Sequence, residues 1–273
     1  MILRHAFDAL ASVLFPAPCR ICEATLTSAS AIPICPSCLA SLVPLSGPAC
    51  HRCGRPFPSA VAAEGPQPLC FACRRGVYAF DCARSFAAYN QAMVGAIVLL
   101  KYHQVTRLGR WFAQRLVEIV RRDPQTFKAD VVVPVPLHPA RRRERGYNQA
   151  ELIARPLARR LGLPLRGYLL VRTRPRPDKL ILSRRERWES VRGAYATRER
   201  APVDNLRILL VDDVFTTGAT LDSCARALRG AGASSVIGLT VARAVPWWSP
   251  PLPAEGSVRQ TAEASTENDA GRV

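Results

Sequence analysis

The pattern of apolar and polar positions predicts an α/β protein. Ile208 to Val211 form a short continuous apolar run, which is typical of a central strand covered on both faces. Val131 to Val135 form a similar run, and "SSVIGLTVAR" at 234–243 predicts another strand. Helical spacing extends over 91–122, and "TLDSCARALRGAGA" at 220–233 predicts a cleaner helix. Strands and helices alternating in this way imply right-handed crossovers and a mostly parallel sheet flanked by helices.

The segment 129–162 is predicted to run as strand, basic loop and helix. Asn148 and Glu151 form a plausible capping pair at the start of that helix. Pro156 removes a helical hydrogen bond, so a kink is expected there.

The two ends of the chain differ from its middle. Residues 1–18 are predicted to be a docking helix, because five apolar residues fit one helical face: Ile2, Leu3, Phe7, Leu10 and Leu14. Asp8 interrupts the apolar segment, which argues against a signal peptide. No run of about 20 uncharged apolar residues exists, so we expect no transmembrane helix and a cytoplasmic location. The tail at 249–273 has little apolar content and is expected to be disordered.

Eight of the ten cysteines fall into four C-x-x-C pairs: Cys19 and Cys22, Cys35 and Cys38, Cys50 and Cys53, Cys70 and Cys73. Each pair can present two thiolates to one ion, and two pairs complete a tetrahedral zinc site. Twelve residues separate the first two pairs and sixteen the last two, which is close to the spacing of zinc ribbons. The cysteines therefore predict a double zinc-ribbon-like domain over residues 19–80.

A disulfide framework and redox chemistry are the two alternatives to zinc for these cysteines. A disulfide framework needs an oxidising compartment, for which the N-terminus gives no support. Redox chemistry needs one C-x-x-C pair rather than four. A site closed by four cysteines leaves no open position, so the zinc is expected to be structural. Spacing alone leaves open whether the pairs bind sequentially or in a crossed arrangement.

Positive charge is concentrated in the middle of the chain. Of the formal net charge of +17, residues 141–200 contribute +12, with eighteen Lys and Arg against six Asp and Glu. Such a segment raises the local affinity for phosphate, pyrophosphate or a nucleic-acid backbone. The alternative is a solvated arginine-rich face that keeps the protein soluble.

The loop after Val211 is the strongest candidate site, because ligands of open α/β sheets bind at the carboxyl ends of strands. Backbone amides around Gly218, threonine hydroxyls and a helix beginning near Ala219 suit a phosphate group. Asp212 and Asp213 would repel that phosphate, so ribose hydroxyls are their natural partners. The Walker and G-x-G-x-x-G patterns are both missing. The loop therefore predicts a phosphorylated ribose as ligand.

Two segments carry a resemblance to known proteins. "ILLVDDVFTTGAT" at 208–220 resembles the phosphoribosyl pyrophosphate (PRPP) signature of type I phosphoribosyltransferases. "VVVPVPLHPARRRERGYNQAELIA" at 131–154 is similar to the ComF family, as are "LKYH" at 100–103, "LSRRERWESVRGAY" at 182–195 and the cysteine pairs. The resemblance covers roughly residues 10–245 and implies a type I phosphoribosyltransferase-like domain over 84–246.

The resemblance also implies roles for individual residues. Asp212 and Asp213 would hold the ribose 2′ and 3′ hydroxyls, directly or through Mg²⁺. The residues that would wrap the 5′-phosphate are Thr216, Thr217, Gly218, Ala219 and Thr220. Those that would bind pyrophosphate, from a loop and from a mobile lid, are Arg141, Arg142, Arg143, Arg145, Arg184 and Arg185. Purine-salvage members carry an aspartate where Thr216 stands, so the acceptor stays open.

Two functions remain as hypotheses. The first is an enzyme, a phosphoribosyltransferase that uses Mg²⁺ and PRPP, or a related ribose phosphate, on an unknown acceptor. The second is a nucleic-acid-handling scaffold of the competence type, whose ribbons and arginine-rich surface engage single-stranded DNA or a helicase while the ribose-phosphate site binds a regulator. The ComF resemblance implies DNA uptake or related processing in either case.

Overall fold

The computed structural model describes residues 17–26, 30–63, 65–175, 183–199 and 201–245. Most of the expected docking helix and the whole expected tail lie outside these ranges. Within them, no helix is long and apolar enough to cross a membrane.

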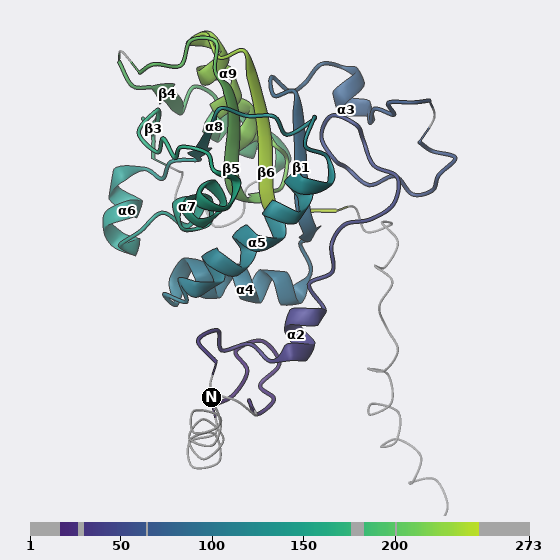
Figure 1. Ribbon diagram of the computed structural model, residues 1–273, viewed down its shortest axis with the longest axis vertical. Coiled ribbons are helices and arrows are strands. Elements are labelled where there is room, and N and C mark those ends of the chain that lie inside the picture. The colour runs from purple at the N-terminus through teal and green to yellow at the C-terminus, as the bar shows by residue number, and fades with distance from the viewer. Residues whose placement is uncertain (1–16, 27–29, 64, 176–182, 200, 246–273) are drawn as a thin grey trace, which may run out of the picture.

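Four parallel strands form the central sheet, which confirms the predicted fold class (Figure 1). In spatial order they are β1 (Cys82–Ala88), β6 (Ser235–Arg243), β5 (Arg207–Phe215) and β2 (Val131–Pro134). Successive side chains of a strand point to opposite faces, so β5 sends Leu209 and Val211 to one face and Ile208 and Leu210 to the other. The sheet is therefore apolar on both sides and must be covered on both.

Three helices cover one face of the sheet, and one helix covers most of the other face. The first face packs against α4 (Gln91–Tyr102), α5 (Arg107–Arg122) and α7 (Gln149–Leu161). The second packs against α9 (Ala219–Gly230). The remaining elements are α2 (Pro36–Ala40), α3 (Phe71–Arg74), α6 (Pro139–Arg145), α8 (Arg184–Val191) and the antiparallel pair β3 (Leu170–Arg172) and β4 (Tyr195–Thr197).

Three local predictions need correction. The strand that starts at Ile208 does not end at Val211 but continues to Phe215, so both aspartates lie within β5. The expected basic loop is largely the helix α6, which starts at Pro139 and ends at Arg145, followed by Gly146 in the left-handed region. Helical spacing over 91–122 belongs to two helices separated by residues 103–106.

The start of α7 follows the prediction in part. The Asn148 side chain accepts a hydrogen bond from the amide of Ala150, as an N-cap should. Glu151 does not complete a capping box; its carboxylate pairs with Arg142 and Arg155 instead. The helix runs through Pro156 to its end.

Candidate functional site

Two groups of four cysteines lie at different places on the domain. One group holds Cys19, Cys22, Cys35 and Cys38, and the other Cys50, Cys53, Cys70 and Cys73. Within each group all sulfur atoms lie within 4.8 Å of one another, as ligands of one tetrahedral ion must. The pairs therefore combine sequentially, which settles the question that spacing left open. We call these groups the first and second cysteine clusters.

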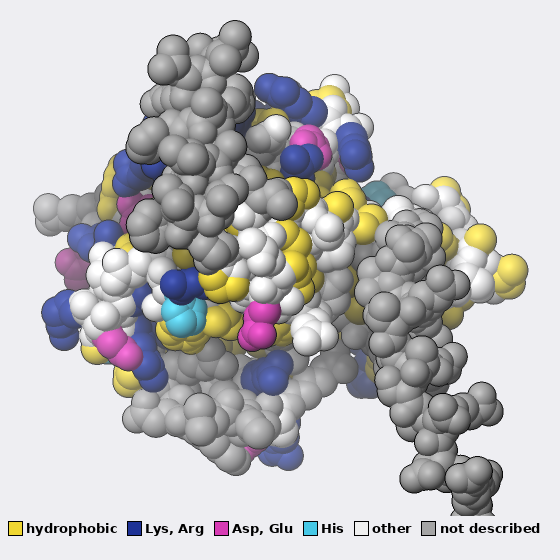
Figure 2. Space-filling view, turned by 90° about the horizontal axis from the view of Figure 1, so that it is seen from below, with side chains coloured by type: hydrophobic (Ala, Val, Ile, Leu, Met, Phe, Trp, Pro, Cys, Tyr) yellow, Lys and Arg dark blue, Asp and Glu magenta, His cyan; other side chains and the backbone are white. Residues whose placement is uncertain are grey.

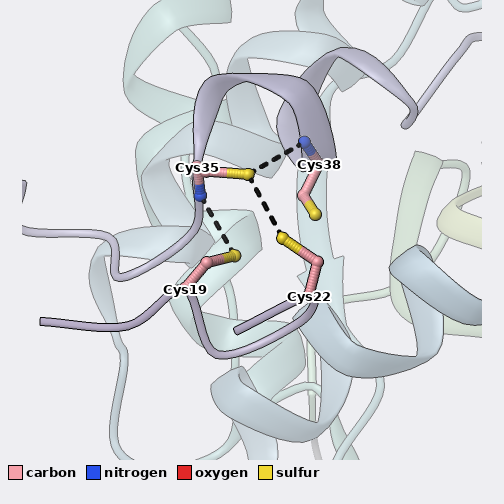
Figure 3. A group of neighbouring side chains, drawn as sticks. All are labelled: Cys19, Cys22, Cys35 and Cys38. Carbon is pink, nitrogen blue, oxygen red and sulfur yellow. Dashed lines mark hydrogen bonds between the residues drawn. The ribbon is translucent and has the colours of Figure 1, made fainter. Parts of the chain in front are cut away.

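Backbone amides donate hydrogen bonds to sulfur atoms in each cluster. In the first cluster the amide of Cys35 donates to the Cys19 sulfur at 3.2 Å, and the amide of Cys38 to the Cys35 sulfur at 3.4 Å (Figure 3). In the second cluster the amide of Cys70 donates to the Cys50 sulfur at 3.3 Å. Thiolate donors in this arrangement fit Zn²⁺, and a closed four-sulfur site has a folding role rather than a catalytic one.

The clusters differ in burial and in what they pack against. Cys22 of the first cluster is exposed, whereas all four cysteines of the second are buried. The first cluster packs with α4, α5 and α7 on one face of the sheet. The second packs with Phe215 and α9 on the other face. Figure 1 accordingly shows α2 beneath α4, and α3 beside β1.

Asp212 and Asp213 lie at the carboxyl end of β5, just past the last residue that pairs with β2. Both are buried, with 6% and 5% of their surfaces exposed. Lys101, in the last turn of α4, forms an ion pair with Asp213. The two carboxylates also accept backbone hydrogen bonds: Asp212 from the amide of Asp213 and Asp213 from the amide of Val214, both at 2.9 Å.

This arrangement moves the pKa values of the two carboxyls in opposite directions. Burial, together with repulsion from Asp213, raises the pKa of Asp212 well above its usual range. Burial acts in the same sense on Asp213, but the Lys101 ammonium outweighs it and lowers the pKa of that carboxyl. The Lys101 pKa is raised, because the attraction of Asp213 exceeds the effect of burial. The two adjacent carboxyls thus differ, with the pKa of Asp212 above the usual carboxyl range and that of Asp213 below it.

The loop from Thr216 to Thr220 follows directly. Gly218 has a φ of +81° and precedes α9 without a side-chain cap on the helix. The backbone amides of Thr216, Thr217 and Gly218 donate to no other residue in the described part of the chain. Free amides at the positive end of a helix attract anions. Two carboxylates and a loop with free backbone amides are therefore adjacent at one strand end.

The predicted pyrophosphate residues lie on two other helices. Arg141, Arg142, Arg143 and Arg145 belong to α6, and Arg184 and Arg185 begin α8. Arg142 pairs with Glu151, Arg145 donates to Gln149 and Arg185 pairs with Glu189. The side chain of Arg184 lies outside the described part of the structure. A pyrophosphate role for these residues stays a prediction.

Three residues of this region were not singled out from the sequence as site residues. Lys101 belongs to the "LKYH" segment, which resembles the ComF family but gave no indication that Lys101 is a site residue. Tyr78 donates its hydroxyl to the Thr217 carbonyl at 3.0 Å, and Arg243 places its guanidinium 4.1 Å from the centre of the Phe215 ring. Long-range contacts bring both to the loop, and no local pattern signals them.

A hollow lies between α5, α7 and residues 30–32, away from the strand-end site. This groove has a volume of about 900 Å³. Its basic lining residues are Arg107, Arg110, Arg155, Arg159 and Arg160. Only Arg155 has an ion-pair partner among the described residues. Figure 2 shows how widely basic side chains are spread on the molecule as seen from below, where few acidic ones interrupt them. We call this hollow the arginine groove.

Comparisons with known proteins agree with this division of the chain. The double zinc ribbon domain family matches residues 10–74, and the phosphoribosyl transferase domain family matches residues 148–246. The DNA utilization protein YhgH of Salmonella typhimurium is 30% identical over 190 residues, which are 68% of this chain and 80% of the relative. The competence protein ComFC of Bacillus subtilis is 29% identical over 217 residues, 77% of this chain and 84% of the relative.

Among solved structures, the purine phosphoribosyltransferase of Pyrococcus horikoshii is similar over 55% of this chain and 94% of its own. The sequence identity is 18% and the TM-score 0.31, so the likeness is distant.

Proposed function

This chain belongs to the ComF/YhgH family, in which a double zinc ribbon accompanies a phosphoribosyltransferase domain. From that premise we propose that the chain binds PRPP together with Mg²⁺. The observation that carries the proposal is the adjacency of the buried pair Asp212 and Asp213 to the free amides of residues 216–218.

Each half of the ligand has matching chemistry. The amides of residues 216–218 and the positive end of α9 suit the 5′-phosphate. Asp212 and Asp213 suit the ribose hydroxyls, and their oxygens are the ligands that Mg²⁺ prefers. Bound Mg²⁺ supplies positive charge against the pyrophosphate. Lys101 balances Asp213 before the ligand enters, which limits the cost of two adjacent buried carboxylates.

The test is calorimetric titration of PRPP with Mg²⁺ into the zinc-loaded chain. We expect the wild type to bind and the Asp212→Asn, Asp213→Asn double variant to lose binding. Asp130→Asn is the matched control, since Asp130 pairs with Arg207 at the opposite end of the sheet. Failure of a folded wild type to bind would overturn the proposal. Where binding is found, pyrophosphate release in the presence of trial acceptors tests for transfer.

The arginine groove supports a second function, which is contact with the backbone of a single-stranded nucleic acid. Four arginines of the groove have no described ion-pair or hydrogen-bond partner: Arg107, Arg110, Arg159 and Arg160. Unpaired guanidinium groups around one concavity attract a chain of phosphates. Trp111 is the one aromatic side chain among the described lining residues, so little base stacking, and hence little sequence preference, is expected.

Salt-dependent binding of a fluorescent oligonucleotide tests this second function. The Arg107→Gln, Arg110→Gln variant should bind more weakly, and the slope of log affinity against log salt should fall by about 1.4, which is about 0.7 for each phosphate contact removed. Arg121→Gln, Arg122→Gln is the matched control, because it removes the same charge from the far end of α5. Equal affinities for the two double variants would refute the assignment to the groove.

A further inference from the structure

The segment that leaves the second cysteine cluster is fastened to the start of α9. The Tyr78 hydroxyl donates to the Thr217 carbonyl at 3.0 Å. The amide of Ala79 donates to the Asp222 carboxylate at 2.7 Å, and Arg226 donates to the Val77 carbonyl at 3.1 Å. These three bonds join residues that are more than 130 apart in the sequence. They hold the segment against residues 216–220, which we call the phosphate loop after their proposed ligand.

The Tyr78 ring fills the space under Gly218. It stacks on Phe80 with ring centres 4.7 Å apart and meets Phe215 at 6.1 Å. A Cβ atom on Gly218 would lie 2.7 Å from Tyr78 Cε1. The glycine therefore permits both the left-handed turn and the close approach of the ring. The Thr217 carbonyl belongs to the same peptide plane as the Gly218 amide, so the bond from Tyr78 restricts rotation of that peptide and holds the Gly218 N–H in one direction.

Arg243 links the same loop to the metal ligands. This residue ends β6 and is 4% exposed. Its guanidinium donates to the Cys53 carbonyl at 2.7 Å, contacts the Cys53 sulfur at 3.5 Å and lies over the Phe215 ring. No carboxylate pairs with it among the described residues. Four thiolates around one Zn²⁺ leave a net negative charge, which is the compensation that a buried arginine needs.

We propose that Tyr78 and Arg243 are positioning residues that make the second cysteine cluster part of the ribose-phosphate site. Tyr78 fixes the Thr217 carbonyl, and Arg243 fixes Phe215 at the base of the loop. The first cluster has no such role, because it packs on the opposite face of the sheet, where Ile21 touches α4 at Gly95. The claim for PRPP itself rests on the proposed function, whereas the claim for loop order does not.

Reciprocity follows from this linkage. If metal in the second cluster orders the loop, then a phosphate ligand on the loop must favour metal retention in the second cluster by the same factor. The metal affinity of the first cluster should not change when the ligand binds. The two clusters thus differ in a measurable way despite their equal ligand sets.

The first test needs no ligand and follows hydrogen–deuterium exchange of peptides covering 213–221 in the zinc-loaded chain. Tyr78→Phe removes one hydroxyl but keeps the ring, so exchange there should rise about fivefold while β2 and β6 stay protected. Tyr168→Phe is the matched control, because Tyr168 is an exposed tyrosine far from the loop in sequence. Unchanged exchange in Tyr78→Phe would overturn the proposal.

The same measurement separates the two cysteine clusters. Arg243→Gln and Cys70→Ser should raise exchange at 213–221, whereas Arg229→Gln and Cys22→Ser should not. Arg229 is the matched arginine, since it holds Asp81 of the same linking segment at the other end of β6. Equal effects of Cys70→Ser and Cys22→Ser would contradict the special role of the second cluster.

Titration of PRPP with Mg²⁺ completes the design. We expect affinity about threefold to tenfold lower in Tyr78→Phe with two zinc ions retained. Wild-type affinity in that variant would overturn the positioning role. If the wild type binds no PRPP while the exchange effects appear, the ligand assignment fails and the structural link stands, so the two failures are distinct.

Discussion

Lys101→Met tests the electrostatic balance of the candidate site. Methionine keeps much of the aliphatic length of lysine and removes its charge. Asp213 then has no ion-pair partner among the described residues, although its side chain is only 7% exposed and Asp212 is adjacent. A buried carboxylate without compensation must either stay ionised at a cost or take up a proton.

The size of the effect follows from burial. Breaking a buried ion pair by removing one partner costs about 3 to 5 kcal/mol. The Lys101 side chain is 21% exposed, so water already offsets part of the pairing, and we expect a loss of about 2 to 3 kcal/mol in the free energy of unfolding. Adding Asp213→Asn removes the unpaired charge and should restore about 1 to 2 kcal/mol.

The pH dependence has a definite sign. The pKa of Asp213 is lowered in the folded chain, so its pairing contributes stability above the usual carboxyl pKa of about 4. That contribution is lost as pH falls through the folded pKa. The difference between wild type and Lys101→Met should therefore be greatest near neutral pH and shrink in acid.

The assay is urea unfolding of zinc-loaded wild type, both single variants and the double variant at neutral pH. The four free energies give the coupling between Lys101 and Asp213 directly. A loss below about 0.5 kcal/mol in Lys101→Met, or a coupling near zero, would refute the argument that this pair is buried and mutually compensating.

Three further predictions concern the loop, the carboxyl pair and the metals. Gly218→Ala should lower the free energy of unfolding by about 2 to 4 kcal/mol, because the new Cβ would lie 2.6 Å from Phe215 Cζ. Gly146→Ala should lower it by only about 1 kcal/mol, because Gly146 has a φ of +84° but nothing lies within 4 Å of its Cβ position. Urea unfolding measures both. Because the pKa of Asp212 is raised, binding of Mg²⁺ and PRPP should release a proton from this carboxyl. The binding affinity should therefore increase as pH rises from the usual carboxyl range toward the pKa of Asp212. Calorimetry in buffers of different ionisation enthalpy measures the proton release, and no release would contradict the prediction. A chelator should remove zinc in two phases, the faster one from the first cluster, where Cys22 is exposed; a single phase would contradict this.

Local patterns in the sequence predicted much of the fold. Apolar runs at 131–135, 208–211 and 234–243 correspond to parallel strands, because a strand covered on both faces must be apolar on both. The helix α6 was missed although its signals are present: Pro139 at the start and Gly146 just past the end. The four arginines and one glutamate between them suggested a basic loop, but charge alone does not distinguish an exposed helix from a loop.

In the candidate site, too, the local features could be predicted from the sequence and the long-range contacts could not. The motif at 208–220 places carboxylates and a phosphate loop together, since both are local to one strand and its turn. The extension of β5 through Asp212 and Asp213 could not be predicted, because polar residues in a buried strand need a partner, and that partner is Lys101 on a distant helix. Tyr78 and Arg243 likewise act across 139 and 190 residues of sequence. Single-sequence patterns do not encode contacts of that range.

The two cysteine clusters show why a motif does not by itself define a role. Both consist of two C-x-x-C pairs, and the spacing gives no reason to treat them differently. The difference lies in their neighbours: the first cluster meets the apolar side chains that cover α4, whereas the second meets a buried arginine at the carboxyl end of the sheet. The chain has a net charge of +17, so cationic side chains outnumber anionic ones. A buried guanidinium needs an anionic partner, and the thiolates of the second cluster lie next to that of Arg243. The net negative charge of four thiolates around one Zn²⁺ would therefore compensate the Arg243 guanidinium, and we expect loss of the metal to disturb residues 216–220 before it disturbs the sheet.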